Sequence, residues 1–202
     1  MASRPGPIGG QPISPQRRPM LVRCIVIGIV LTVVLVGFVV LVVWLAVRPQ
    51  RLVYTVEDGK VHGFDLYKNH LNASFDFILK SYNPNHKISL YYDSIEVSVA
   101  YDDKIIAFDY VDPFHQPRHN VTRLEVKPMA RSVPLMGSVS KNLRIEKSSG
   151  QIELAVLVKA RIRFKVGIWK SSHHTLKVYC KPVGVQLDPS RKFETTYCDV
   201  NS

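Results

Sequence analysis

An uncharged apolar run near the N-terminus constrains this 202-residue chain more than any other feature of the sequence. The 24 residues from Cys24 to Val47 contain no charged side chain. A helix rises about 1.5 Å per residue, so this run would be about 36 Å long, enough for the roughly 30 Å hydrocarbon core of a bilayer. A surface helix of a soluble protein carries a polar stripe, which this run lacks. We predict a transmembrane helix over residues 21–47.

A cleavable signal peptide is the main alternative for the same run. The apolar region of a signal peptide is about 7 to 15 residues long and ends in a small-x-small cleavage site. Here the run is longer, and Ala46 is followed directly by Val47, Arg48 and Pro49. We therefore expect an uncleaved signal-anchor that makes the chain an integral, single-pass membrane protein.

The orientation across the membrane is predicted from features on both sides of the helix. Four arginines and no acidic residue precede the uncharged run that begins at Cys24, and Arg48 and Arg51 follow it, which is a modest positive-inside bias. Beyond the helix, Asn72 and Asn120 begin N-x-Ser/Thr sequons, which are glycosylated only in the lumen of the secretory pathway. Residues 1–20, rich in Pro and Gly, are expected to form a disordered cytosolic tail. Residues 48–202 are expected to form one extracellular domain.

The three cysteines fall on both sides of the predicted membrane segment. Cys180 and Cys198 follow the helix, where an oxidising compartment would allow them to form a disulfide that closes 17 intervening residues. Two separate buried thiols are the alternative. Cys24, at the cytosolic edge of the helix, is a candidate for palmitoylation, although such a cysteine is more often only an apolar helix residue.

Side chains alternate between apolar and polar along most of the segment after the helix. Residues 71–79 place apolar side chains at the odd positions and polar ones, including Asn72, at most of the even positions. The longest such segment is "QIELAVLVKARIRFKV", residues 151–166. Several strands at short spacing, separated by Pro, Gly and Asn turns, predict an all-β, antiparallel β-sandwich. No segment beyond residue 50 keeps a helical period for three turns, so no helix is expected there.

Four cations occupy alternate positions in the second half of that longest segment. They are Lys159, Arg161, Arg163 and Lys165, and alternation places them on one face of a strand. Such a row suits a polyanion or another partner surface. A solvated sheet face, or protection of a strand edge against pairing, is the slightly favoured alternative. Residues 48–202 hold 23 basic and 16 acidic residues, which suits acidic wall polysaccharide or anionic lipid as partner. A basic surface that only keeps the domain soluble explains this charge equally well. Nucleic acid is disfavoured by the compartment.

Catalytic and metal-binding motifs are not evident in the sequence. His115 and His119 lie four residues apart, but Pro117 between them prevents the helix that would align both as ligands. The chain has no HExxH or CxxC motif and no nucleophile elbow or Gly-rich phosphate loop. We therefore expect no metal, no cofactor and no enzymatic activity.

The segment "KSYNPNHKISLYYDSIEVSVAYDDKIIA" carries a resemblance to a known family. Its Asn-Pro-Asn turn and its Tyr-Asp-Asp hairpin resemble the group-2 late-embryogenesis-abundant (LEA-2) domain. The short basic tail, the single helix followed by Arg48-Pro49, and "KVGIWKSSHHTLKVYCKPV" at Lys165–Val183 resemble the plant harpin-induced, non-race-specific-disease-resistance-like membrane proteins. The resemblance covers nearly the whole chain from Arg17 on.

This resemblance implies a fibronectin-type-III-like sandwich at the plant plasma membrane, with members also at plasmodesmata. It implies a part in defence and abiotic-stress responses without catalytic residues. Two functions follow as hypotheses. The first is non-catalytic binding of protein or cell-wall partners outside the cell. The second is a structural stress protectant that associates with lipid.

Overall fold

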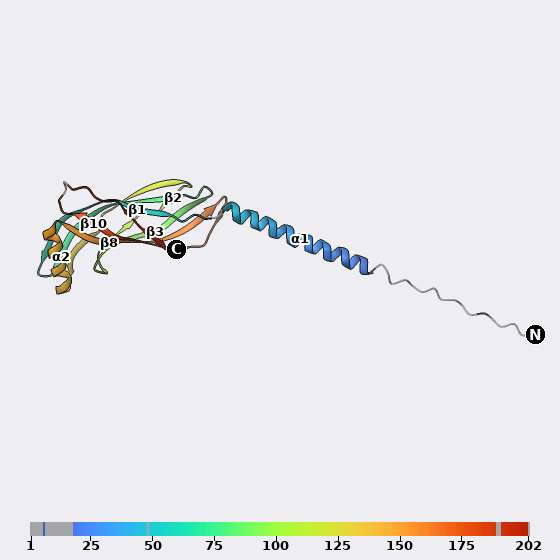
Figure 1. Cartoon of the computed structure of the whole chain (residues 1–202), viewed down its shortest axis with the longest axis horizontal. Coiled ribbons are helices and arrows are strands. Elements are labelled where there is room, and N and C mark those ends of the chain that lie inside the picture. The colour runs from blue at the N-terminus through green and yellow to red at the C-terminus, as the bar shows by residue number, and fades with distance from the viewer. Residues whose placement is uncertain (1–5, 7–17, 48, 189–190, 202) are drawn as a thin grey trace, which may run out of the picture. The chain divides into compact units, whose positions relative to one another are not determined.

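The computed structural model describes residue 6 and residues 18–47, 49–188 and 191–201. The chain divides into two compact units, residues 1–48 and residues 49–202. The first unit contains helix α1 and the second contains the β-strands and helix α2 (Figure 1). Most of the predicted disordered tail lies outside the described residues.

Helix α1 covers Arg18–Val47, 30 residues that include the whole predicted membrane segment. Its large apolar side chains from Met20 to Val42 make no core within this unit and are exposed. The stretch Met20–Val42 is long and apolar enough to cross a membrane. The hydroxyl of Thr32 donates to the carbonyl of Gly28 at 2.8 Å, so this polar group is satisfied inside the helix.

Over its described residues, the second unit contains twelve strands and one helix in the order β1–β7, α2, β8–β12. The strands are β1 Val53–Tyr67, β2 His70–Asn83, β3 Ile88–Tyr101, β4 Lys104–Val111, β5 Phe114–Gln116, β6 Asn120–Val126, β7 Met129–Pro134, β8 Gln151–Val166, β9 Trp169–Lys170, β10 His174–Gln186, β11 Thr196–Tyr197 and β12 Asp199–Asn201. Helix α2 covers Gly137–Ser149.

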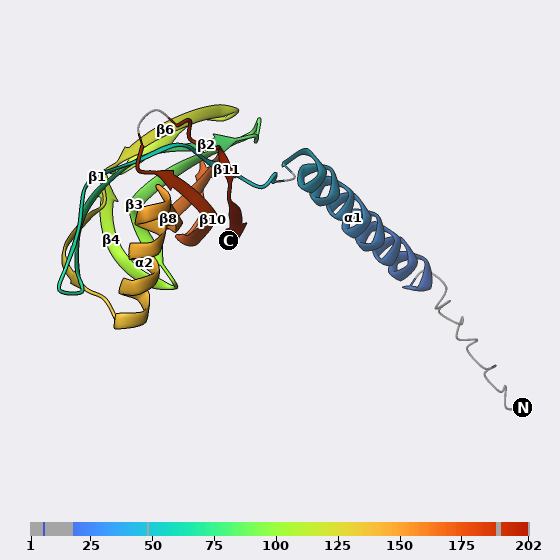
Figure 2. The same ribbon diagram turned by 60° about the vertical axis from the view of Figure 1, so that its left-hand side comes forward.

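The predicted β-sandwich is wrong, because the sheet closes on itself. Hydrogen-bonded neighbours run β1-β10-β8-β3-β4-β7-β2, and β2 pairs again with β1. These seven strands form a β-barrel (Figure 2). Six of the seven junctions are antiparallel, and the β1–β10 junction is parallel.

Bulges in several strands explain how the sheet can close. Register shifts interrupt several ladders, for example between Val56 and Asp58 and between Cys180 and Val183. Such bulges bend a strand and increase its twist, which lets a sheet curl into a barrel. Two junctions of the ring are short: one residue pair, Lys60 with Gln186, joins β1 to β10, and another, Phe108 with Met129, joins β4 to β7.

The predicted alternation of the strands is confirmed by their burial. Apolar side chains at odd positions of β2, from Leu71 to Leu79, are buried, and so are the even positions of β8 from Ile152 to Ile162. Leu176, Val178 and Cys180 of β10 are also buried, as expected for one face. The predicted Asp102-Asp103 turn joins β3 to β4, with positive φ angles of 49° and 59°. This is the backbone that a two-residue hairpin of type I′ requires.

Helix α2 contradicts the expectation of no helix beyond residue 50. Its Val139 and Leu143, four residues apart, are buried on one side, whereas Ile145 is exposed. The helix ends at Gly150, whose φ of 85° is the left-handed conformation of a C-cap. Only two large apolar residues face the core, so the helical period was too weak to distinguish from a loop.

The barrel has two distinct ends. At the α2 end lie helix α2, the β1–β2 turn at Lys68–Asn69 and the β3–β4 turn at Asp102–Asp103. Figure 1 shows α2 at this end of the β-strands. At the linker end, the end of β8 pairs with the beginning of β3, Val166 with Ile88, near Gln50.

Candidate interaction surface

The structure places the four predicted cations on the outer side of β8. Lys159 and Arg161 are exposed, and Arg163 and Lys165 are half-buried, while the residues between them face the core or its rim. On the neighbouring strand β10, Lys177 lies opposite Lys159 and adds a further positive charge. Together these residues form the cationic row.

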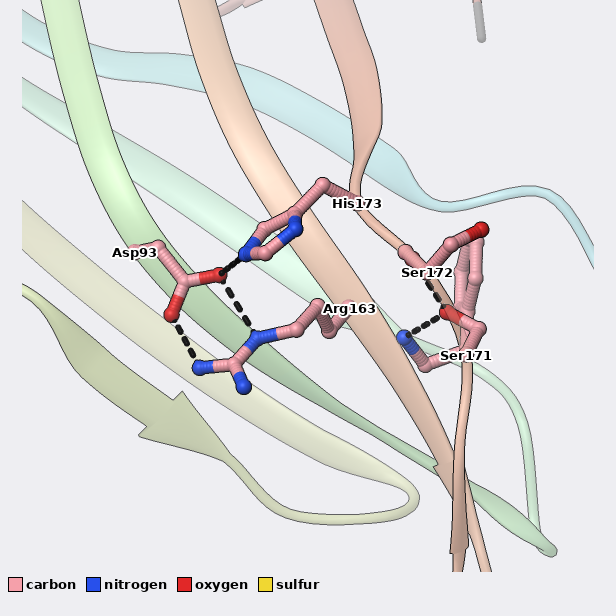
Figure 3. A network of polar contacts seen from close by, with 6 residues as sticks. Asp93, Arg163, Ser171, Ser172 and His173 are labelled. Carbon is pink, nitrogen blue, oxygen red and sulfur yellow. Dashed lines mark hydrogen bonds and ion pairs between the residues drawn. The ribbon is translucent and has the colours of Figure 1, made fainter.

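One member of the cationic row is neutralised (Figure 3). Arg163 Nε donates to Asp93 Oδ2 at 2.8 Å, and Arg163 Nη2 donates to Asp93 Oδ1. His173 Nε2 lies 3.4 Å from Asp93 Oδ2. The hydrogen bonds from the Arg163 guanidinium lower the pKa of Asp93, and the carboxylate in turn raises the pKa of Arg163. The remaining members, among the described residues, make no ion pair.

Beside Arg163, the chain folds back through Ser171, also seen in Figure 3. The backbone N–H of Phe164 donates to Ser171 Oγ at 3.0 Å, and Ser171 Oγ donates to the carbonyl of Ser172 at 2.7 Å. Ser171 also donates its own N–H to the carbonyl of Phe164 at 2.8 Å. These bonds hold His173 close to Asp93.

An aromatic side chain gathers further cations near the linker end. The ring of Tyr91 lies 4.5 Å from Lys170 Nζ and 5.9 Å from both Lys165 Nζ and Arg163 Cζ. His115 approaches the same ring, with 4.5 Å between the ring centroids. A cation over an aromatic face is attracted by the negative face of the ring. Tyr91 therefore concentrates positive charge at this end of the barrel.

A shallow hollow of about 240 Å³ continues this basic region. Its lining includes Lys87, Arg118 and Lys165 and no acidic side chain. Within the described part of the chain, none of these three cations makes an ion pair. The hollow can accept an anionic group at the linker end.

The linker end is closed by buried amide side chains. Asn85 Oδ1 accepts from the N–H of Gln50 at 2.7 Å, and Asn85 Nδ2 donates to the carbonyl of Gln50 at 2.9 Å. Asn83 Nδ2 donates to the carbonyls of Ile88 and Pro117, at 2.9 Å and 3.0 Å, and Asn83 Oδ1 accepts from Asn85. The Asn-Pro-Asn turn therefore clamps the linker that follows α1 onto the barrel.

Deeper in the barrel, a second group of polar side chains continues from this clamp. Gln116, fully buried, accepts from Tyr92 Oη at 3.2 Å and from Ser81 Oγ at 3.3 Å. The hydroxyls of Tyr92 and Tyr54 lie 2.5 Å apart. Burial raises the pKa of Tyr54, so its phenol stays protonated and available as a donor. These bonds satisfy the polar groups that the linker end buries.

Acidic and basic side chains lie together at the opposite, α2 end. Tyr101 Oη donates to Glu146 Oε1 at 2.7 Å, and Glu146 Oε2 accepts from the N–H of Glu153 at 3.0 Å. Burial, together with Glu146, raises the pKa of Tyr101. Asp102 and Asp103 line the same region. Cations accompany these acids, because Lys181 Nζ lies 3.4 Å from Asp103 Oδ1 and α2 itself carries three basic residues. The α2 end is therefore mixed in charge, whereas the lining of the hollow at the linker end has no acidic side chain.

The two predicted sequons lie toward opposite ends of β2. Asn72, near the beginning of β2, is exposed, and its Oδ1 accepts from the N–H of Ser132 at 2.8 Å. Asn120, the first residue of β6, is half-buried and lies opposite Asn83, the last residue of β2. Whether either asparagine carries a glycan stays a prediction.

The cysteines occupy distinct environments in the structure. Cys180 on β10 is bonded to Cys198, which lies between β11 and β12, with 4.2 Å between the Cα atoms. β12 pairs antiparallel with β10, and the N–H of Cys198 donates to the carbonyl of Tyr54 at 3.0 Å. Cys24 is a free, exposed cysteine on α1, and its palmitoylation stays a prediction.

Four of the histidines, His86, His115, His119 and His174, form ring contacts in the structure. His86 and His119 stack with 4.4 Å between ring centroids. Over the described residues, no group of three or more His, Cys, Asp or Glu side chains is arranged to hold a metal ion.

Sequence reasoning missed the contribution of other residues to the basic region: Lys87, Tyr91, Arg118 and Lys170. Their contacts join chain segments that are far apart in sequence, and only the fold brings them together. The segment "KVGIWK" did hold a local signal, since it places two large apolar residues after a glycine and between two lysines.

These features define a class of protein: a closed β-barrel that follows one apolar helix, with a basic outer surface and a clamped linker. Residues 79–180 match the family described as late embryogenesis abundant protein, LEA_2. An uncharacterized protein of Arabidopsis thaliana is 39% identical over 178 residues, which cover 87% of this chain and 80% of the relative. NDR1/HIN1-like protein 3 of Arabidopsis thaliana is 30% identical, with 88% of this chain and 80% of the relative covered. For NDR1/HIN1-like protein 10 of the same plant the identity is 30%, with coverage of 83% and 75%.

The chain belongs to the family of NDR1/HIN1-like proteins with an LEA_2 domain. The predicted family is thus confirmed. Membership fits a role in plant stress or defence, and these families are not known as enzymes.

Proposed function

We propose that the protein is a single-pass plasma-membrane protein whose barrel binds acidic partners outside the cell, without catalysis, in plant defence and stress responses. The partner class is acidic cell-wall polysaccharide or an acidic protein surface. The observation that carries this proposal is the cationic row on β8, whose Lys159 and Arg161 are exposed and make no ion pair within the described residues.

The spacing of the cationic row suits a linear polyanion. Alternate residues of a strand are about 6.6 Å apart on one face, so Lys159, Arg161 and Lys165 present charges along a line. Lys177 on the adjacent strand widens this line. Attraction between exposed charges is screened by salt, so binding should weaken as the ionic strength rises.

The membrane topology in this proposal has three supports. α1 has the length and composition of a spanning helix. The sequons at Asn72 and Asn120 and the bonded pair of Cys180 and Cys198 all follow α1 in the chain. Disulfides persist in oxidising compartments, and N-glycans are added in the lumen, so both features suit an extracellular barrel.

The topology is tested by glycosylation of the full chain in plant cells. Endoglycosidase should increase the gel mobility of the protein, and N72Q combined with N120Q should abolish that change. A reporter fused after Ser202 that is accessible only from the cytosol would contradict the topology.

The binding proposal is tested with the full chain in lipid nanodiscs and immobilised polygalacturonate. K159E with R161E should weaken binding about tenfold or more, equivalent to about 1.4 kcal/mol per factor of ten. K141E with R144E is the matched control, because it changes the net charge equally at two exposed positions of α2. An equal loss in both variants would show that only net charge matters and would refute a role for the cationic row.

A further inference from the structure

The β8–β9 hairpin exposes two large apolar side chains at its tip. Val166 pairs with Trp169, so Gly167 and Ile168 form a two-residue turn. Gly167 has a φ of 58°, and a glycine at the first central position is typical of a type II′ hairpin. Ile168 is fully exposed, and Trp169 is 64% exposed. We call Gly167, Ile168 and Trp169 the hairpin tip.

The hairpin tip lies at the linker end and is surrounded by cations. Lys165 and Lys170 pair with each other on either side of the tip. Lys87 and Arg118 line the same hollow as Gly167. A large exposed apolar group bordered by positive charges is a poor arrangement for water but a favourable one for the interface of a lipid bilayer.

Covalent connectivity keeps the linker end close to the end of α1. Only three residue steps separate Val47, the last residue of α1, from Gln50, which is hydrogen-bonded to Asn85 of the barrel. An extended chain spans at most about 3.6 Å per residue, so Gln50 stays within about 11 Å of the helix end. This limit holds for any orientation of the barrel relative to the helix. If α1 spans a bilayer, as proposed above, the linker end must lie near the lipid headgroups.

We propose that the hairpin tip is a membrane-docking site that inserts Ile168 and Trp169 into the headgroup layer of the bilayer that holds α1. The side chains of Lys87, Arg118, Lys165 and Lys170 contact lipid phosphates around the insertion. Tryptophan favours this layer because its ring is apolar while its N–H can still donate a hydrogen bond.

A weak intrinsic affinity is sufficient for this docking. The tether of α1 makes the contact intramolecular, which gives the tip a high effective concentration at the membrane. Docking fixes the tilt of the barrel and leaves the α2 end away from the lipid. This inference rests on the proposed membrane insertion of α1. It shares only Lys165 with the cationic row and does not involve Lys159 or Arg161.

The chain contains only two tryptophans, Trp44 in α1 and Trp169 in the tip, which allows a direct test. The full chain carrying W44F is reconstituted into phosphatidylcholine vesicles containing some phosphatidylglycerol. A fraction of the lipids carries a bromine or spin-label quencher near the top of the acyl chain. We expect strong quenching and a blue shift of Trp169 emission.

A matched control exists at the other end of the barrel. Tyr67, the last residue of β1, is 64% exposed, the same fraction as Trp169, but lies at the α2 end. In the W44F/W169F background, Y67W should emit like a tryptophan in water and show little quenching by the same lipids. Equal quenching at both positions would refute docking through the tip.

A variant of the tip tests its chemistry. I168D combined with K170E leaves Trp169 in place and should reduce its quenching to the level of Y67W. Circular dichroism and the Cys180–Cys198 bond report whether the barrel is intact. A blue shift without lipid quenching would mean that a second copy of the chain covers the tip, and it would overturn the proposal.

A separate readout distinguishes this inference from the membrane anchor on which it rests. In W169F, Trp44 reports only on α1 and should be quenched by lipids labelled along the acyl chain. Unquenched Trp44 would refute the membrane-spanning role of α1. Quenched Trp44 together with unquenched Trp169 would refute only the docking site.

Discussion

The two ends of the barrel are closed by different kinds of interaction. At the linker end, Asn83, Asn85 and Gln116 are buried and make hydrogen bonds to backbone and side-chain groups. At the α2 end, Val139 and Leu143 bury apolar side chains over the core. Apolar contact is non-directional, whereas a hydrogen bond fixes both distance and angle. The difference suggests that the α2 end mainly supplies stability and that the linker end mainly fixes position.

The charges at the two ends differ less than these contacts do. The linker end gathers Lys87, Arg118, Lys165 and Lys170, and the lining of its hollow has no acidic side chain. At the α2 end, acids and cations are mixed, because Asp103 pairs with Lys181 and α2 carries three basic residues. Charge alone therefore does not orient the barrel, and the linker end is distinguished by the exposed Ile168 and Trp169 beside its cations.

The largest loss of stability is expected when a buried apolar side chain at the α2 end is truncated. L143A removes a fully buried side chain and should lower the free energy of unfolding by about 3 to 4 kcal/mol. Denaturant unfolding of the full chain in detergent measures the change. I145A on the same helix is the control, because Ile145 is exposed and its loss should cost less than about 0.5 kcal/mol. An equal loss of unfolding free energy in the two variants would contradict a stabilising role of Leu143 at the α2 end.

A somewhat smaller effect is expected from opening the disulfide that joins β10 to the C-terminal segment. C180S with C198S removes a bond that closes 17 intervening residues, which should cost about 3 kcal/mol by the chain-entropy estimate. The loss should fall on β12 and on its pairing with β10, measured by hydrogen exchange. If reduction of the disulfide in the wild-type chain leaves the free energy of unfolding unchanged, this value is wrong.

The hydrogen bonds between Asn85 and Gln50 at the linker end should contribute less to the free energy of unfolding, but they should hold the linker in place. N85A leaves the N–H and carbonyl of Gln50 without the partners they have in the structure, at a cost of about 2 kcal/mol. The amide of Gln50 should exchange much faster with solvent, while the amides of α2 should stay protected. H86A, a change at the exposed neighbour, serves as control. Loss of protection at both ends together would show that the ends are not independent.

The smallest effect is expected at the ion pair beside the cationic row. The pKa of Asp93 is lowered in the folded state, so its stabilisation is complete above the ordinary aspartate pKa of about 3.9 and is lost as the pH falls through the lowered value. D93N should therefore lose a little stability at neutral pH and show a flatter decline in acid than the wild type. S94A is the neighbouring control. A D93N curve that declines as steeply as the wild type would contradict the assignment.

The sequence indicated the strands well but not how the sheet closes. Alternation along β2 and β8 is visible because each of these strands has one face in the core. The same alternation is compatible with a sandwich or a barrel, and the difference lies in junctions of one residue pair, such as Lys60 with Gln186. Helix α2 was missed because only Val139 and Leu143 among its large apolar residues are buried.

The basic surface was predicted only in part, for a related reason. The cationic row was visible because its members alternate along one strand. Neutralisation of Arg163 by Asp93 was not, since 70 residues separate the two. The clamp was equally hidden, because Asn85 and its partner Gln50 lie 35 residues apart. The Asn-Pro-Asn motif was visible as a turn, and its role in holding the linker depends on the fold.

The closed ring has a consequence for a plant cell that is losing water. Drying concentrates proteins, and an unpaired strand edge can then recruit a second molecule into a growing sheet. Over the described residues, each of the seven ring strands has a hydrogen-bonded neighbour on both sides. The two one-pair junctions leave only short stretches of β1, β4, β7 and β10 outside the ring ladders. Other edges belong to short strands such as β5, β9, β11 and β12, of two or three residues each, and to β6, which carries Arg123 and Glu125. Such a protein offers little template for fibre growth at the moment when crowding is greatest.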